Sequence, residues 1–325
     1  MAVPPKPDRD FFEAEASRLP SFEEARNLAV ASKSNGEAAA KARLILAAAL
    51  AGAAFAAPKH VAEIYDGAAS GWLDAPVNAT RIPAHDAPVF PISAEFWASF
   101  WDAIDARETF DALGITARIV TLGLFLPPEF QEHAARASAA YPGIARIDAT
   151  HMPPRVQLDD LARCPEGSLG NAFYRLIVDN KFDLEVLDRD ALQLRDLTPP
   201  LNYLNTRILQ AHDLWHIVGG YDVTKLHEIG ISAFQLAQFG HSYSAMFLAF
   251  IAAVSAFGEP EGFALSMQTI FTAWKHGRET APMMLIPWEE IWNQSTEAIR
   301  AKYGIVPYPT PFPANLLEQL EELRA

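Results

Sequence analysis

Helix-forming residues dominate this chain, and no other feature constrains its fold as strongly. Residues 21–32 and 36–57 are rich in Ala, Leu and Glu, which favour helices. An aromatic-rich segment at 94–106 predicts a further helix. So does the segment after Pro127-Pro128, because proline is favoured at the first helical position. We therefore expect a mainly α fold with a multi-helix core.

One run in the first half resembles a strand. Residues 117–126 (ARIVTLGLFL) contain β-branched side chains, which fit either a strand or a short buried helix. Residues 149–157 (ATHMPPRVQ) predict a linker and place a domain boundary near residue 153. On this interpretation residues 1–152 form an N-terminal helical extension of unknown role, and residues 153–325 form a second helical domain.

The second half predicts longer helices, each bounded by Pro or Gly. These helices are expected from the turn at 165–170 to about Asn180, from Pro199-Pro200 to the Gly219-Gly220 break, over about 224–256, from Glu259-Pro260 to about Lys275, and from Pro287 to Tyr303 before Gly304.

Composition excludes several classes of function. The chain has 26 basic and 40 acidic residues, a formal net charge of −14. An acidic surface repels phosphate, so no nucleic-acid partner is expected. Half of the 325 residues are apolar, enough for a large core. The single cysteine, Cys164, excludes an internal disulfide framework and a cysteine-built metal site.

Targeting signals and membrane spans are not expected. The acidic N-terminus does not fit a mitochondrial presequence. The apolar run 44–57 has 14 residues, too few to cross a bilayer. Residues 229–257 are long enough but contain Gln235, Gln238 and His241, so a buried helix is favoured. We expect a cytoplasmic protein in a bacterium; peripheral contact with the inner membrane stays open.

The chemically informative segment is residues 204–228 (LNTRILQAHDLWHIVGGYDVTKLHE). His212 and His216 are four residues apart, so both imidazoles project from one helix face and can reach one ion. They continue an apolar stripe of Leu204 and Ile208, which is expected to face the interior. Buried imidazoles need polar partners, because an unsatisfied buried polar group costs about 1–3 kcal/mol.

Two carboxylates complete the candidate site. Asp213 is turned about 100° from His212 around the helix, so it lies on the flank of the same site. The Gly219-Gly220 break lets the next helix fold back antiparallel and bring Glu228 opposite the histidines. Two imidazoles and two carboxylates suit zinc or another first-row divalent ion. Spacing alone leaves a chance pair of buried histidines as an equal alternative.

The motif resembles that of a known family. His212-Asp213-x-x-His216, followed by eleven residues and Glu228, is similar to the motif of the Coq-four family of ubiquinone (coenzyme Q) biosynthesis proteins. Three more segments resemble the family in the same order: PEGSLGNAFYRLI (165–177), GRETAP (277–282) and PWEEIWNQSTEAIRAKYGI (287–305). The resemblance covers about residues 165–306. It leaves out residues 1–152, and typical members lack so long an N-terminal part.

The resemblance implies a helical protein that holds a divalent metal, most often zinc, with His212, Asp213, His216 and Glu228 as ligands. It implies action on polyprenylated benzoquinone precursors, as an oxidative decarboxylase (a lyase) that replaces the carboxyl at ring position C1 by a hydroxyl. It also implies isoprenoid lipid binding, peripheral membrane contact and association with other ubiquinone biosynthesis enzymes. A homodimer stays open.

Physical chemistry limits what such a site can do. A zinc-type ion can bind a substrate carboxylate or phenolate as a Lewis acid, but it cannot move electrons. Oxidation therefore needs dioxygen reacting with the substrate, or a redox-active metal. Four ligands fill a tetrahedral shell, so substrate entry requires expansion of the shell or displacement of a carboxylate. Asp213 and Glu228 are thus the catalytic candidates, as a movable ligand that doubles as general base.

Two other functions compete with a decarboxylase. The first is a non-catalytic, isoprenoid-lipid-binding scaffold for a ubiquinone biosynthesis complex, with a structural metal. The second is a hydrolase, since His-x-x-x-His resembles the zinc peptidase motif; the shorter Asp213 replaces its glutamate, which makes water activation doubtful. HD-type phosphohydrolases also pair adjacent His and Asp, but their further upstream His and distant Asp cannot be assigned here.

Several residues near the motif have simpler explanations. Lys225 and Arg278 are candidates for a carboxylate or phosphate contact, although a solvated surface charge is favoured for each. His227 is expected to point away from the site, and His241 to be a core histidine. Core packing is favoured for the apolar side chains after Glu228, and a lipid groove there follows only from the resemblance. Those side chains are Phe234, Phe239, Tyr243, Met246, Phe247, Phe250 and Phe257.

Overall fold

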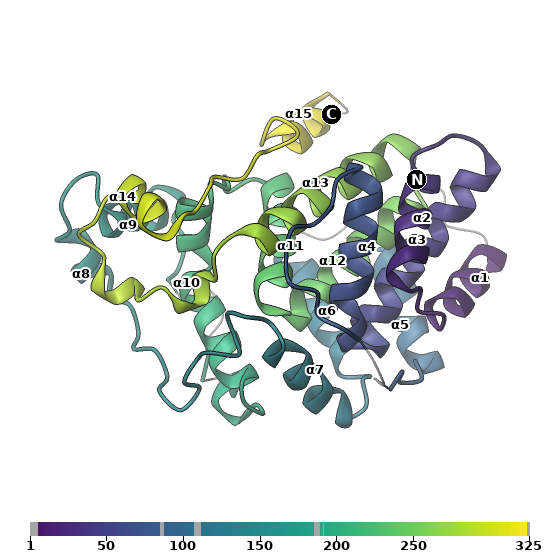
Figure 1. The fold of residues 1–325 in the computed structure, drawn as a ribbon, viewed down its shortest axis with the longest axis horizontal. Coiled ribbons are helices and arrows are strands. Elements are labelled where there is room, and N and C mark those ends of the chain that lie inside the picture. Colours follow the sequence, from purple (N-terminus) through teal and green to yellow (C-terminus); the bar gives the residue numbers. More distant parts are fainter. Residues whose placement is uncertain (1–5, 85–87, 107–111, 185–188, 191, 324–325) are drawn as a thin grey trace.

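The computed structural model describes residues 6–84, 88–106, 112–184, 189–190 and 192–323 (Figure 1). Within these ranges every named element is a helix, and the strand-type pairing is a single isolated β-bridge between Ser168 and Ser295. The predicted mainly α fold is confirmed.

α1 to α5 lie on one side of the molecule, at the right of Figure 1, and α7 lies below the centre. α2 lies along α3 and α4, and α1 lies along α3. A Cβ atom at Gly67 would lie 2.3 Å from the carbonyl oxygen of Phe22, and one at Gly71 would lie 2.2 Å from that of Arg26. Only glycine therefore lets α4 approach α2 so closely. The elements are α1 (Lys6–Ala16), α2 (Phe22–Ser32), α3 (Glu37–Ala56), η1 (Pro58–His60), α4 (Val61–Leu73), α5 (Ala94–Asp105), α6 (Ala112–Gly123) and α7 (Glu129–Ala139).

The helices of the C-terminal region continue the same core. α11 lies along α13, while α12 packs on α3 and α13 packs on α4. One apolar cluster contains buried residues from both halves of the chain. The domain boundary near residue 153 stays a prediction. The elements are α8 (Leu158–Ala162), α9 (Leu169–Asn180), η3 (Leu194–Asp196), α10 (Leu201–Gly219), α11 (Lys225–Phe239), α12 (Ser242–Ala256), α13 (Pro260–Glu279), η4 (Met283–Leu285), η5 (Trp288–Glu290), α14 (Thr296–Tyr303) and α15 (Leu316–Glu322).

Residues 117–123 of the strand-like run at 117–126 lie in α6, which ends at Gly123, and residues 124–126 form a turn beyond it. The β-branched residues of the run divide between two environments: Ile119 is 1% exposed, whereas Val120 is 50% exposed. Leu122 is also buried, three residues after Ile119. This spacing of three matches one face of a helix, which explains why period-two alternation does not apply.

The single helix expected over 224–256 is wrong, because the chain breaks at Gly240. Gly240 closes α11 in the left-handed conformation (φ 63°), and α12 begins at Ser242. The hydroxyl of Ser138 donates to the carbonyl of Gly240 over 2.9 Å. The ring of Tyr141 also lies so close that a Cβ atom at Gly240 would be 2.5 Å from it. The break is therefore fixed by packing against the end of α7.

The continuous helix expected from Pro287 to Tyr303 is also wrong. It is divided into η5 and α14, and the segment between them pairs with the start of α9. The amides of Leu169 and Gly170 donate to the carbonyls of Gln294 and Trp292 over 2.8 and 2.9 Å. Those carbonyls are thus bonded to the start of α9, whereas a continuous helix would have bonded them to amides four residues later. Ser295 instead caps α14 by accepting from an amide of its first turn.

Among the described residues, one helix is long and apolar enough to cross a membrane by length and composition. This is α3, whose most apolar window has a mean hydropathy of 1.5 and is 72% buried inside the protein. The apolar run noted at 44–57 lies mainly within it. Mostly buried core helices of soluble proteins meet the same criterion, and α3 packs against α1, α2 and α12.

Candidate metal centre

Two successive helices bring the candidate ligands together. α10 buries Leu204 and Ile208, and His212 and His216 follow on the same face. α10 ends at Gly219, where Gly220 has a φ of 77° and donates its amide to the carbonyl of His216. Glu228 lies in the first turn of α11.

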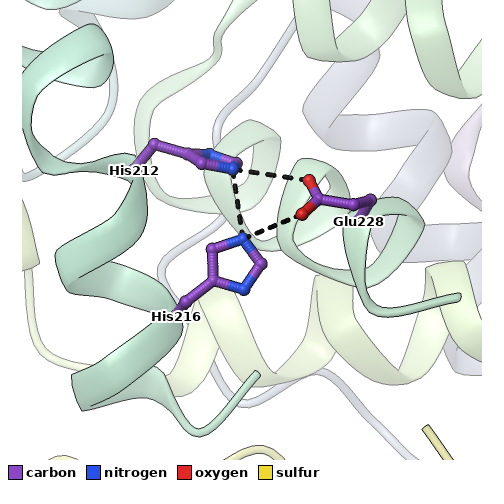
Figure 2. A group of neighbouring side chains, drawn as sticks. All are labelled: His212, His216 and Glu228. Carbon is purple, nitrogen blue, oxygen red and sulfur yellow. Dashed lines mark hydrogen bonds and ion pairs between the residues drawn. The ribbon is translucent and has the colours of Figure 1, made fainter. Parts of the chain in front are cut away.

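Three ligand atoms converge between these helices (Figure 2). Nε2 of His212 lies 3.1 Å from Nε2 of His216. The two carboxylate oxygens of Glu228 lie 3.4 Å from His212 and 3.2 Å from His216. The ligand atoms all fall within 4.8 Å of one another. One cation could therefore contact two imidazole nitrogens and a carboxylate at once.

The site is buried on one side and open on the other. The side chain of His216 is 1% exposed, whereas those of His212 and Glu228 are 30% and 45% exposed. Three protein ligands with solvent access on one side are typical of catalytic zinc sites, which keep a position for water or substrate.

The charges of the three groups support one another. Burial tends to raise the pKa of Glu228, but its hydrogen bonds with His212 and His216 and their charges outweigh burial and hold the pKa well below its usual range. Burial tends to lower the pKa of His212, yet the hydrogen bond and charge of Glu228 raise it overall. The site thus holds an ionised carboxylate and stabilises positive charge beside it, as a cation site requires.

The second nitrogen of each imidazole has its own partner. Nδ1 of His216 lies 3.2 Å from the carbonyl oxygen of Tyr221, which can only accept, so Nδ1 carries a proton, and in the neutral ring the lone pair of Nε2 faces the site. Nδ1 of His212 lies 2.6 Å from the side-chain nitrogen of Gln235. Partners of this kind orient histidine ligands in metal sites.

Sequence reasoning missed Gln235 and Tyr221. A signal for Gln235 exists: it follows Glu228 by seven residues, two helical turns, which places both on one face of α11. Tyr221 acts through its backbone carbonyl, so its side chain gives no such signal.

Asp213 does not join the three converging groups. Its side chain is half-buried, and the group of possible metal ligands contains only His212, His216 and Glu228 among the described residues. Its negative charge contributes to the raised pKa of His212. A direct ligand role for Asp213 stays a prediction.

The neighbouring charged residues have structural partners. His227 is 2% exposed, and its Nδ1 accepts from the amide of Asp222 over 2.7 Å. His241 is 7% exposed and bonds Ser244 over 2.9 Å, as expected for a core histidine. Lys225 is paired with Glu321.

Arg278 corrects an expectation, because it is not a solvated surface charge. Its side chain is 3% exposed, and its Nε lies 3.2 Å from a carboxylate oxygen of Asp66 on α4. The same oxygen accepts a hydrogen bond from the indole of Trp274 over 2.9 Å. This buried ion pair joins α13 to the N-terminal region.

The apolar side chains after Glu228 belong to the core. Phe234 and Phe239 are 0% exposed and Phe250 is 3% exposed. The ring of Phe239 lies 4.7 Å from that of Trp215. Packing therefore accounts for them, as expected, and lipid binding stays a prediction.

Comparison with known proteins decides the family. Residues 148–309 match the family model of the Coenzyme Q (ubiquinone) biosynthesis protein Coq4. The chain belongs to the Coq4 family. The Coq4 match includes α8 to α14 and all three converging residues, and it leaves α1 to α7 outside.

Curated Coq4 relatives are similar over about half of the chain. The mitochondrial ubiquinone biosynthesis protein COQ4 of Eremothecium gossypii is 27% identical over 166 residues, which are 50% of this chain and 49% of that protein. The mitochondrial COQ4 homolog of Rattus norvegicus is 28% identical over 159 residues, 47% of this chain and 56% of that protein. The chain thus spans about half the length of the curated relatives it matches.

A crystallised protein from Nostoc punctiforme PCC 73102 is 24% identical to this chain, with a TM-score of 0.49. The alignment covers 65% of this chain and 96% of that chain.

Proposed function

We propose that this protein is a metal-dependent member of the ubiquinone biosynthesis machinery that acts on polyprenylated benzoquinone precursors. The observation that carries the proposal is the convergence of His212, His216 and Glu228 within 4.8 Å, inside the Coq4 match. Two imidazoles and a carboxylate are the donor set that zinc and similar divalent ions prefer.

The proposed reaction is oxidative decarboxylation with hydroxylation at ring position C1. Exchange of a carboxyl for a hydroxyl breaks the bond between ring and carboxyl, releases carbon dioxide and oxidises the ring by two electrons. We propose that water supplies the hydroxyl oxygen and that dioxygen takes up the two electrons and two protons as hydrogen peroxide. A bound divalent ion would supply Lewis-acid polarisation of the substrate carboxylate or phenolate.

The chain's own residues supply position and proton transfer. The His216 ring is held by the Tyr221 carbonyl, so it is the fixed point of the site. The Glu228 side chain is 45% exposed, so it can turn toward a substrate. Its low pKa keeps it ionised beside the histidines, and it becomes an effective base only when it turns away from them, because they lower that pKa. Asp213, beside His212, is the second candidate base.

The test is deletion of the gene in its host, with mass-spectrometric profiling of prenylated phenols and quinones. We expect loss of ubiquinone and accumulation of a carboxylated prenyl-phenol, restored by the wild-type gene but not by Glu228→Gln or His212→Gln. An unchanged quinone profile contradicts the proposal. If the deletion lowers ubiquinone and both variants restore it, the protein is a non-catalytic scaffold of the pathway.

A further inference from the structure

Gln235 is the buried partner of the more exposed histidine. It lies on α11, two turns beyond Glu228, and is 3% exposed. Its side-chain nitrogen lies 2.6 Å from Nδ1 of His212. Gln235 thus reaches from the helix that carries one candidate ligand to the ring of another.

This contact favours one position for the proton of a neutral His212 ring. An amide nitrogen can only donate, so Nδ1 of His212 must accept. A neutral ring then carries its proton on Nε2, the atom that faces His216 and Glu228. A proton on Nε2 occupies the lone pair that a metal would need.

The two neutral histidines therefore differ in whether Nε2 has a free lone pair for a metal ion. The carbonyl of Tyr221 keeps the proton of His216 on Nδ1, which leaves its Nε2 able to bind. His212 is held in the opposite tautomer.

We propose that Gln235 is a positioning residue that sets the tautomer of His212 and thereby controls metal binding through Nε2. A half-turn of the terminal amide exchanges its nitrogen for its oxygen without changing its shape. The oxygen then accepts from Nδ1–H, and Nε2 presents its lone pair to the ion. This inference rests on the proposed metal site and adds Gln235 as the residue that changes the His212 tautomer there.

The chemistry of the glutamine side chain suits this role. It offers a donor and an acceptor at equivalent positions, so one residue can support both tautomers. A glutamate supports only the Nδ1–H form when ionised, and a methionine of similar length supports neither. The three side chains therefore separate the proposed states.

The experiment uses the full-length protein and its Gln235→Glu and Gln235→Met variants. The tautomer of His212 is read from ¹⁵N chemical shifts of the metal-free protein, and affinity is measured by zinc competition and cobalt absorption. We expect Nε2–H in the metal-free wild type and Nδ1–H in Gln235→Glu. Gln235→Met should bind zinc about 10–100-fold more weakly than wild type, as for other lost partners of ligating histidines, and Gln235→Glu at least as tightly.

Gln238→Met is the matched control. Gln238 lies on the same helix and is 6% exposed, but it donates to the carbonyls of Gly277 and Thr280. Its loss should lower stability and leave zinc affinity unchanged.

The outcomes separate this inference from the proposed function. Failure of the wild type to bind zinc or cobalt overturns the metal-dependent function. An identical His212 tautomer in wild type, Gln235→Glu and Gln235→Met overturns the role of Gln235, whether or not metal binds. Equal loss of affinity in Gln235→Met and Gln238→Met also overturns it, because the effect would then be one of folding.

Discussion

The hydroxyl of Tyr243 on α12 donates a hydrogen bond to Oγ1 of Thr116 on α6 over 2.9 Å. Burial raises the pKa of this hydroxyl, the bond to Thr116 opposes the rise, and the negative charge of Glu228 adds to it. Tyr243 therefore lies near enough to the candidate site for the charge of Glu228 to affect its pKa. Because α6 precedes the Coq4 match, the N-terminal region is in direct contact with the surroundings of that site.

This contact should be measurable as a coupling energy. Tyr243→Phe and Thr116→Val each remove one partner, so each should lower the free energy of unfolding by about 0.5–1.5 kcal/mol. The double variant should lose less than the sum of the two, because the same bond is broken in both. Urea unfolding of the four proteins gives the coupling. Strict additivity would show that the bond does not form in solution.

Zinc should stabilise the fold through the three converging residues. A ligand that binds only the native state adds about 2.7 kcal/mol at a concentration of 100 Kd. We therefore expect the melting temperature to rise with added zinc and to fall on chelation. Glu228→Gln should abolish the zinc-dependent rise, because a neutral amide replaces the ionised carboxylate. The control is Glu132→Gln, which changes an exposed carboxylate on α7 outside the candidate site and should respond to zinc like wild type.

Breaking the buried Asp66–Arg278 pair should cost more stability than breaking an exposed ion pair. Both side chains are less than one-tenth exposed, at 7% and 3%. Arg278→Met would leave a buried carboxylate without its charge partner, which costs about 3–5 kcal/mol. Arg136→Met breaks a pair with Glu132 that is half-exposed on both sides and should cost less than about 1 kcal/mol. Equal losses in urea unfolding would contradict this interpretation.

His241 should make the protein sensitive to acid. Burial, with a smaller effect from the charge of His212, lowers the pKa of His241 to about 3. In the unfolded chain its pKa is about 6.5, so between these values only the unfolded state binds the proton. The free energy of unfolding should therefore have its full value above pH 6.5. It should fall by up to about 1.4 kcal/mol per pH unit as the pH drops toward 3.

His241→Asn removes this ionisation and should flatten the decline between pH 6.5 and 4, measured by urea unfolding across the range. Ser244→Ala is the matched control, because it removes the hydrogen bond to His241 but keeps the ring. That variant should be less stable at every pH with the slope of the wild type. An unchanged slope in His241→Asn would mean that the ring accepts its proton in the folded state.

Gly240→Ala should test the break between α11 and α12. A left-handed conformation costs a non-glycine residue about 1–2 kcal/mol. At Gly240 the new Cβ would also meet the Tyr141 ring at 2.5 Å, so a further loss of about 1–3 kcal/mol is expected from overpacking. Gly304→Ala, at a φ of 65° with open space around it, should show only the first loss. Equal losses of thermal stability in the two variants would show that the Tyr141 ring does not lie against Gly240.

Local sequence patterns predicted most helices because their start and stop signals are local. The aromatic face of α5 and the Gly220 end of α10 are examples, since each depends on residues within one or two turns. At two places the patterns predict one long helix and the structure has two shorter ones, and both breaks depend on distant contacts. Gly240 is held by Ser138 and Tyr141, and the gap before α14 is held by the amides that start α9.

The candidate site shows the same division. The spacing of His212 and His216 and the Gly-Gly break predict Glu228 opposite the histidines, and the three side chains do converge. The spacing does not predict whether the Asp213 side chain points into the site. One helical step of about 100° from His212 places Asp213 on the flank, from which it could point either way. The burial of Arg278 also could not be predicted, since its partner Asp66 is more than two hundred residues away.

The backbone contacts at Gly67 and Gly71 limit how the N-terminal region can evolve. Neither residue carries a reactive group, and both precede the Coq4 match. Yet any side chain there would force α2 away from α4, so in a library of random variants both positions should tolerate substitution as poorly as His212 does. Sequence drift in this region is then confined to its solvent-facing residues. A descendant that kept its histidines but lost either glycine would keep the ligands and lose the scaffold that packs beside them.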